Sequence, residues 1–351
     1  MLPYSKSDAK DYFRQKLGGG GMETVLLPSY KPETLELDEQ GVRNDIRRVA
    51  RIPGIRSFVM VSAPNDLKEM RRLMEISADE ANKVGLAAGI FVNEPEGGPQ
   101  LELGSRLDSG LKNTVRVIRE WEEMGGQIVF FGYPLNFRPK SEAEVVEFTR
   151  CVADQVDIAF MLYCTRHHKW DLPGGTISPR TIAELAKLPN AVAIKHAPGD
   201  LAHTAQTLKL CGDRILVGDP FEANWIPAIK MGMECIVGNC IIHHWQTEEF
   251  HPLYDYVQAA LNGDFDRAWE VYWSLQPMRD LWWSVHAHPF HMGIHPFSHW
   301  KYWEGLVGMT GGPLRQVTPL VHHDVRDQSK ALWRHYGILR GDIAYQDAVI
   351  R

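Results

Sequence analysis

The stretch ISPRTIAELAKLPNAVAIKHAPGDL (177–201) contains the two patterns that decide the fold. Residues 178–188 have the apolar spacing of an amphipathic helix, and AVAIKHA (191–197) is a short apolar run typical of a buried strand. The same alternation continues in both directions along the 351 residues. Eight strand-like runs follow one another: TVLLPSY (24–30), SFVMVS (57–62), LAAGIFV (86–92), QIVFFGYP (127–134), DIAFMLY (157–163), AVAIKHA (191–197), RILVGDP (214–220) and ECIVGN (234–239).

Apolar strands that alternate with helices indicate a parallel sheet covered by helices, and eight such units suggest closure into a barrel. We therefore predict an α/β fold, a (β/α)8 TIM barrel over 22–245, preceded by an N-terminal arm (1–21) with a flexible Gly18–Gly21 hinge. After about residue 245 the pattern becomes helical, which predicts a C-terminal helical region over 246–351. An open doubly wound sheet is the alternative, although no G-x-G-x-x-G follows the first strand.

The intervening helices have recognisable N-terminal signals. Asp66, Ser141 and Ser178 each precede a periodic run, where a side-chain oxygen can accept a hydrogen bond from the first turn.

Composition limits the classes of partner. The net charge of −6 lacks the basic excess that nucleic acid binding requires, and no apolar run reaches the roughly 18 residues of a membrane span. The five cysteines are odd in number and include no C-x-x-C, which argues against a disulfide framework or a zinc ribbon. The polar N-terminus has no apolar core of a signal peptide, so we expect a cytoplasmic protein without membrane or nucleic acid partners.

Lys195 is the first candidate for chemistry. It lies inside the run 191–197 on the face that it shares with Ala193 and Ala197. Residues near the carboxyl ends of barrel strands meet the active site, and desolvation of an amine favours the neutral form that attacks carbonyls. The structural alternative is a lysine at the barrel mouth that is paired with a carboxylate.

Tyr163 ends the preceding strand on the face of Ala159 and Met161, so it can point into the same barrel mouth as Lys195. A phenol beside an amine can move the protons that imine formation requires. The structural alternative is a core tyrosine whose hydroxyl bonds the backbone.

These residues and their surroundings resemble the dihydrodipicolinate synthase/N-acetylneuraminate lyase family. The match includes Leu162-Tyr163, ISPRTIAELAKLPNAVAIKHAPGDL, ILVGDP, MGMECIVGN (231–239) and WEGLVGMTGGPLR (303–315), in the family's order. The resemblance implies a TIM barrel with Lys195 as the Schiff-base lysine and Tyr163 as the proton carrier. It also places Gly218, Asp219 and Val237 beside the substrate and implies a homotetramer or dimer.

Several family segments are altered. The segment that would hold a pyruvate carboxylate reads VSAPND (61–66), so that Ser62 and Ala63 stand in its place. The family's Pro-Tyr-Tyr turn reads PLNFRP (134–139), which removes the tyrosine that reaches a neighbouring subunit. Beyond Tyr163 a longer loop, CTRHHKWDLPGG (164–175), offers cations for an anionic substrate: Arg166, His168 and Lys169.

A segment rich in tryptophan and histidine, WWSVHAHPFHMGIHPFSHW (282–300), has no counterpart in these motifs. We interpret it as a roof over the barrel mouth, with Trp283 against a bulky or aromatic substrate, and we expect His243, after the last strand, to supply a base or a hydrogen bond. The alternative is a metal site formed by His286, His288 and His291.

The sequence therefore predicts a class I lyase, that is, an aldolase, hydratase-aldolase or keto-acid dehydratase. Its substrate would be a small carbonyl compound, a 2-oxo acid with a bulky or aromatic portion, and no metal or other cofactor is expected. Two alternatives are a metal-dependent hydrolase that uses the histidine cluster and a barrel that binds ligands without catalysis.

Overall fold

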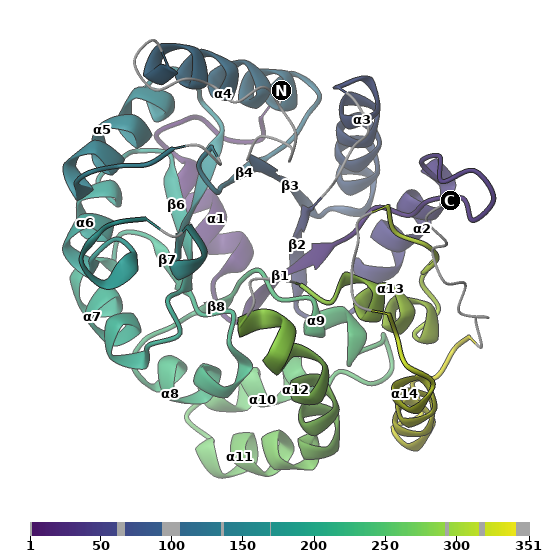
Figure 1. The fold of residues 1–351 in the computed structure, drawn as a ribbon. Helices are drawn as coiled ribbons and strands as arrows, with labels where there is room; N and C mark the ends of the chain where they lie inside the picture. Colours follow the sequence, from purple (N-terminus) through teal and green to yellow (C-terminus); the bar gives the residue numbers. More distant parts are fainter. Residues whose placement is uncertain are drawn as a thin grey trace.

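A computed structural model of the chain describes residues 2–61, 67–92, 106–134, 137–168, 170–291, 295–315 and 320–341. Eight parallel strands form a barrel in the order β7-β6-β5-β4-β3-β2-β1-β8 (Figure 1). The predicted TIM barrel is confirmed, and the doubly wound alternative is wrong. The strands are β1 (Gly21–Leu26), β2 (Ile55–Met60), β3 (Ala87–Val92), β4 (Ile128–Phe131), β5 (Ala159–Thr165), β6 (Ala191–Ala197), β7 (Leu216–Gly218) and β8 (Cys235–Ile236).

The barrel closes between β7 and β8 by close packing rather than by a ladder. Gly218 lies so near Val237 that a Cβ on the glycine would be 2.5 Å from Cγ2 of the valine. Each predicted apolar run overlaps one strand, and β6 has the predicted bounds. The first strand begins at Gly21, three residues before the predicted start. It therefore includes Glu23, a residue of the site described below.

Helices cover the outside of the barrel because their apolar faces pack on the outward faces of the strands. Ser141 and Ser178 cap their helices as predicted, by accepting hydrogen bonds from the backbone N–H of Glu144 and Thr181. Asp66 lies outside the described residues. These helices are α2 (Glu39–Val49), α3 (Leu67–Val84), α4 (Arg106–Glu123), α5 (Glu142–Ala153), α6 (Pro179–Leu185), α7 (Leu201–Cys211) and α8 (Trp225–Lys230).

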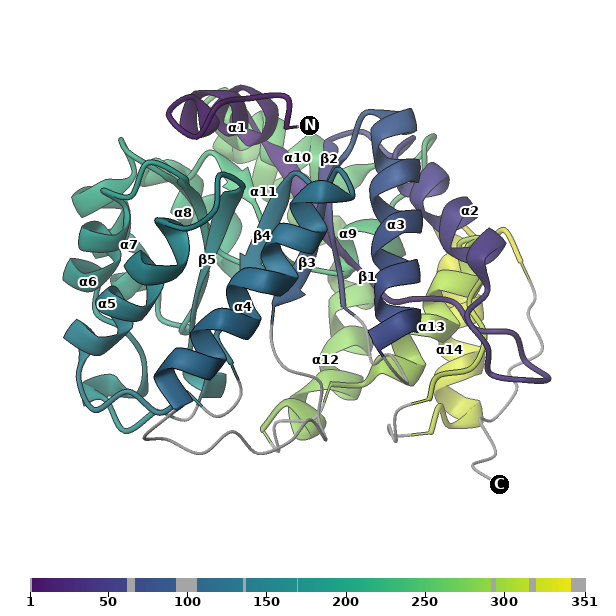
Figure 2. The ribbon, with the colours of Figure 1, turned by 90° about the horizontal axis from the view of Figure 1, so that it is seen from above.

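The N-terminal segment is a packed element. Helix α1 (Ala9–Leu17) lies across one end of the barrel, with Phe13 and Leu17 fully buried (Figure 2). The glycine run after it is a fixed turn rather than the predicted flexible hinge. Gly20 has φ +89°, and its N–H donates to the carbonyl of Glu234, while a Cβ there would lie 2.3 Å from the Gln258 amide.

The C-terminal third is helical, as the sequence predicts, and packs beside the barrel. It contains α9 (Ile241–His244), α10 (Pro252–Leu261), α11 (Phe265–Ser274), α12 (Gln276–His291), α13 (Phe297–Leu306) and α14 (His323–His335). A buried ion pair attaches it to the barrel, because the Arg279 guanidinium on α12 binds both oxygens of Glu222 at 2.7 Å. Across the described ranges, we find no helix of the length and apolarity that a membrane span requires.

Candidate active site

Lys195 lies on β6 with its side chain inside the barrel. Its strand neighbours are Tyr163 on β5 and Gly218 on β7, each directly opposite the lysine in the ladder. The Nζ atom is 5.3 Å from the ring centroids of both Phe130 and Tyr163. Burial lowers the pKa of the amine to about 8, against the opposing effect of Glu23, so about a tenth of the lysine is neutral at pH 7. This neutral fraction is the form that carbonyl addition requires.

Tyr163 is held by an aromatic cluster. Its ring meets Phe91, Phe130 and His168 edge-on, with centroids 5.9, 5.1 and 5.3 Å away. Burial raises the pKa of its phenol, while a hydrogen bond with the side chain of Thr165 partly opposes that rise. At neutral pH the tyrosine therefore holds its proton beside Lys195, as a proton carrier must.

A third ionisable group, Glu23, was not predicted. Its carboxyl group is 1 % exposed, and Oε2 accepts a hydrogen bond of 3.2 Å from the Ser57 hydroxyl on β2. Burial raises its pKa to about 7, and the charge of Lys195 acts in the opposite direction. A signal existed in the sequence, because Glu23 interrupts an otherwise apolar run. The predicted strand began one residue later and so excluded it.

Of the predicted cationic residues, His168 alone is shown near the nucleophile. It lies in a 3-10 turn (Arg166–His168), and its ring stacks on Trp170 at 4.3 Å while it meets Tyr163. Arg166 is exposed on the same turn. Lys169, Ser62 and Ala63 lie outside the described residues.

Three residues that were predicted to bind substrate have their polar atoms in other contacts or are exposed to solvent. The carboxylate of Asp219 is occupied by structural hydrogen bonds from the Phe221 N–H and the side chains of Asn224 and Thr204. His243 is fully buried behind β1, where Nδ1 lies 2.6 Å from Thr24 Oγ1. The side chain of Trp283 is 48 % exposed, so it does not line an enclosed site.

Gly218 is next to Lys195, and Val237 packs against Gly218. Gly218 is the strand neighbour of Lys195, and its lack of a side chain lets Val237 pack closely. Because neither residue offers a polar side chain, they shape the wall beside the amine.

The histidine-rich segment does not present His286 as a metal ligand. Its Nε2 accepts a hydrogen bond of 2.7 Å from the Trp300 indole, and its Nδ1 is 2.9 Å from the Trp282 carbonyl. The ring also stacks on Trp282 at 3.7 Å. Both ring nitrogens are therefore used within the protein. The side chains of His288 and His291 lie outside the described residues.

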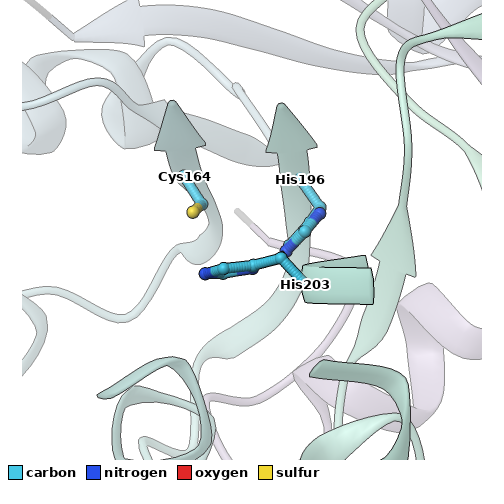
Figure 3. Close-up of side chains that lie close together, drawn as sticks. All are labelled: Cys164, His196 and His203. Atoms are coloured by element: carbon cyan, nitrogen blue, oxygen red, sulfur yellow. The ribbon is translucent and has the colours of Figure 1, made fainter. Parts of the chain in front are cut away.

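Two other groups of side chains have metal-ligand chemistry. Cys164, His196 and His203 converge on the outer side of β5 and β6 (Figure 3). His196 Nε2 and His203 Nδ1 are 2.7 Å apart and share a hydrogen bond, while burial raises the pKa of the Cys164 thiol to about 12. The two histidines bond each other and Cys164 bonds Thr176 and the Ile177 carbonyl, so a metal would have to displace existing bonds.

The second group is His243, His244 and Glu304, all buried beside β1. Lys301 lies in the same group, with Nζ 2.6 Å from Glu304 Oε2. The lysine already supplies the cation that the Glu304 carboxylate requires, which disfavours a metal ion there.

Comparison with known proteins identifies the family of the chain. The model of the dihydrodipicolinate synthetase family matches residues 110–295. A 4-hydroxy-tetrahydrodipicolinate synthase from Methanospirillum hungatei is 25 % identical over 309 residues, which cover 84 % of this chain and 91 % of that protein.

Two solved structures share the fold at 16 % identity. Dihydrodipicolinate synthase from Aquifex aeolicus has a TM-score of 0.71 and covers 92 % of this chain and 100 % of its own. N-acetylneuraminate lyase from Fusobacterium nucleatum has a TM-score of 0.69, with 92 % and 99 % covered. Since the family model spans more than half of the chain, the protein belongs to the dihydrodipicolinate synthetase family and is a class I, Schiff-base-forming lyase.

Proposed function

We propose that Lys195 is the nucleophile of this lyase and that Tyr163 moves its protons. The observation that supports this most directly is the placement of both groups in one register on β5 and β6, with the pKa of the amine lowered to about 8. The neutral amine adds to a carbonyl carbon, and Tyr163 gives a proton to the oxygen as the carbinolamine forms. A second proton then lets that oxygen leave as water, which produces the iminium.

The iminium is the group that makes carbon–carbon or carbon–oxygen cleavage possible. It withdraws the electron pair left behind when an adjacent bond breaks, and the pair is held as an enamine until a proton is added. Hydrolysis then releases the product and restores the lysine. These reaction steps are common to an aldolase, a hydratase-aldolase and a dehydratase.

We propose a 2-oxo acid with a bulky or aromatic portion as the substrate. Phe91 and Phe130 stack at 4.9 Å beside Tyr163, and His168 stacks on Trp170 on the other side of that tyrosine. Flat apolar surfaces of this kind favour an aryl group over a small polar one.

The test is a trapping series. The protein is incubated with pyruvate and with 2-oxo acids that carry an aryl group, reduced with cyanoborohydride, digested and analysed by mass spectrometry. We expect an adduct on the peptide containing Lys195, with more adduct from the aryl compounds, and none in Lys195→Arg. Absence of any adduct, together with stoichiometric zinc, would favour the hydrolase, and absence of both would favour a binding barrel.

Self-association into a dimer or tetramer is a further proposal. It rests on the family resemblance, and light scattering on the purified protein would test it. A single species with the mass of one chain across micromolar concentrations would exclude it.

A further inference from the structure

Glu23 lies inside the barrel, on the same side of the wall as Lys195. The next residue, Thr24, bonds His243 on the outer side, and strand residues alternate between the two faces. The hydroxyl of Ser57 lies 3.2 Å from one oxygen of the Glu23 carboxyl group and 3.0 Å from the Ala87 carbonyl, which also accepts a hydrogen bond from it. The other oxygen, Oε1, is buried and has no hydrogen-bond partner among the described residues. A buried carboxyl oxygen without a partner is costly, so its retention inside the barrel requires an explanation.

The Lys195 side chain lies against Gly238, whose backbone bonds the strand that carries Glu23. A Cβ at Gly238, after β8, would lie 2.5 Å from Cδ and 2.8 Å from Nζ of the lysine, so the amine rests on this glycine. The N–H of Gly238 donates to the backbone carbonyl of Glu23 at 3.1 Å. Gly238 therefore contacts the Lys195 side chain and also bonds the backbone of Glu23.

The other ionisable groups around the amine are neutral acids near pH 8. Burial raises the pKa of the Cys240 thiol well above its usual value, and it also raises the pKa of the Tyr163 phenol. Cys235, on β8 near Glu23, is likewise an uncharged thiol because burial raises its pKa. Within the part of the chain that the structure describes, Glu23 is therefore the anion whose charge acts on Lys195.

We propose that Glu23 is a positioning residue whose carboxylate is the internal counter-charge of Lys195 and of the iminium that the lysine forms. This role rests on the proposed function and adds to it. Condensation of a ketone with the ammonium form gives an iminium and one water overall, so the site carries one positive charge both before and after the reaction, although the attacking form is the neutral amine. A buried cation that persists requires an anion nearby, and Glu23 supplies it.

The first test measures the amine without imine chemistry. Trace acetylation of the whole protein between pH 5 and 11, with the extent of modification at Lys195 read by mass spectrometry, gives the pKa of that lysine. We expect Glu23→Gln to lower this pKa by about one unit, because an attractive charge is lost. Glu23→Asp should retain most of the wild-type value. Thr24→Val, on the opposite face of the same strand, should leave it unchanged.

A second variant covers the case in which Glu23→Gln does not fold. Ser57→Ala keeps the carboxyl group but removes the hydroxyl that favours its ionised form, so fewer Glu23 side chains are charged near pH 8. The pKa of Lys195 should then fall by about half as much. A Lys195 pKa within 0.2 unit of wild type in a folded Glu23→Gln, or in Ser57→Ala if that is the variant that folds, would overturn the proposal.

The second test measures the equilibrium yield of trapped imine against pH. Below the pKa of Lys195, Glu23 stabilises the ammonium and the iminium alike, so Glu23→Gln should leave the yield unchanged. Above that pKa the competing form is the neutral amine, and the yield should fall about tenfold, the counterpart of a one-unit shift. An equal fall at every pH would indicate a structural role and contradict the proposal. If wild type forms no imine at all, the proposed function fails, but the acetylation experiment still tests the charge pairing.

Discussion

Gly238 and Lys195 meet inside the barrel so closely that a side chain at position 238 would displace the end of the lysine. The glycine has φ +68°, and any Cβ there would lie 2.5 Å from Cδ of the lysine. The segment after β8 therefore fixes where the amine can lie. Glycine at position 238 leaves room for the lysine side chain and also readily adopts the left-handed backbone conformation.

Gly238→Ala should abolish or strongly reduce imine formation by displacing the Lys195 side chain. The matched control is Gly337→Ala, at φ +70° with no heavy atom within 4 Å of the new Cβ. Both substitutions should cost about 1–2 kcal/mol of stability, because both force a left-handed conformation on alanine. Borohydride trapping and thermal unfolding of the two proteins would separate the effects. Equal trapping in both variants would contradict the proposed contact.

Tyr163→Phe should lower turnover by about 10²–10⁴-fold, since it removes a proton carrier while leaving the ring contacts with Phe91 and Phe130 in place. The control is Tyr133→Phe, which removes another buried hydroxyl, bonded to Thr149 at 2.9 Å. That variant should lose about 1 kcal/mol of stability and keep its activity. Steady-state kinetics with the substrate found by trapping would measure both, and similar losses in the two variants would argue against the role of Tyr163.

The rate of imine formation should depend on pH through the amine. Addition requires neutral Lys195, whose pKa of about 8 lies below its usual 10.5. The rate should fall about tenfold for each pH unit below 8 and level off above it. Single-turnover trapping from pH 5.5 to 9.5 would show this. A rate that still rises about tenfold per pH unit at pH 9.5 would mean that the lysine is not desolvated.

Arg279→Met should destabilise the protein by about 3–5 kcal/mol, because Glu222 would remain buried without its cation. Arg267 makes a similar contact with Glu270, but both side chains are exposed. Arg267→Met should therefore leave the urea midpoint unchanged. Equal midpoints for the two variants would show that the buried pair does not hold α12 to the barrel.

The barrel could be predicted because its strands are buried on both faces and therefore apolar throughout. Lys195 and Tyr163 could be predicted because the alternation of β5 and β6 assigns each to a face. Glu23 and Gly238 could not, because they meet the lysine from β1 and from the segment after β8. Such distant contacts depend on how the barrel closes, which local periodicity does not encode.

The hydrogen-bond partners of His243 and Asp219 could not be predicted for a related reason. Both follow strands at the end of the barrel where the site lies, but their polar atoms are bonded to Thr24 and to Thr204 on the outer side. The sequence reveals a polar side chain near a strand end, but not which partner it has. In both cases the packing of the folded chain determines which hydrogen-bond partner the side chain has.

The most direct test of the central claim is the site of the covalent adduct. Wild-type protein, Lys195→Met and Lys301→Met should each be treated with pyruvate or an aryl 2-oxo acid and reduced with borodeuteride. Lys301 is the matched control because it is also a buried lysine, 1 % exposed. We predict a deuterium-labelled adduct on Lys195 in wild type, its loss in Lys195→Met and its retention in folded Lys301→Met. A labelled adduct on another lysine, or one that survives in Lys195→Met, would contradict the account.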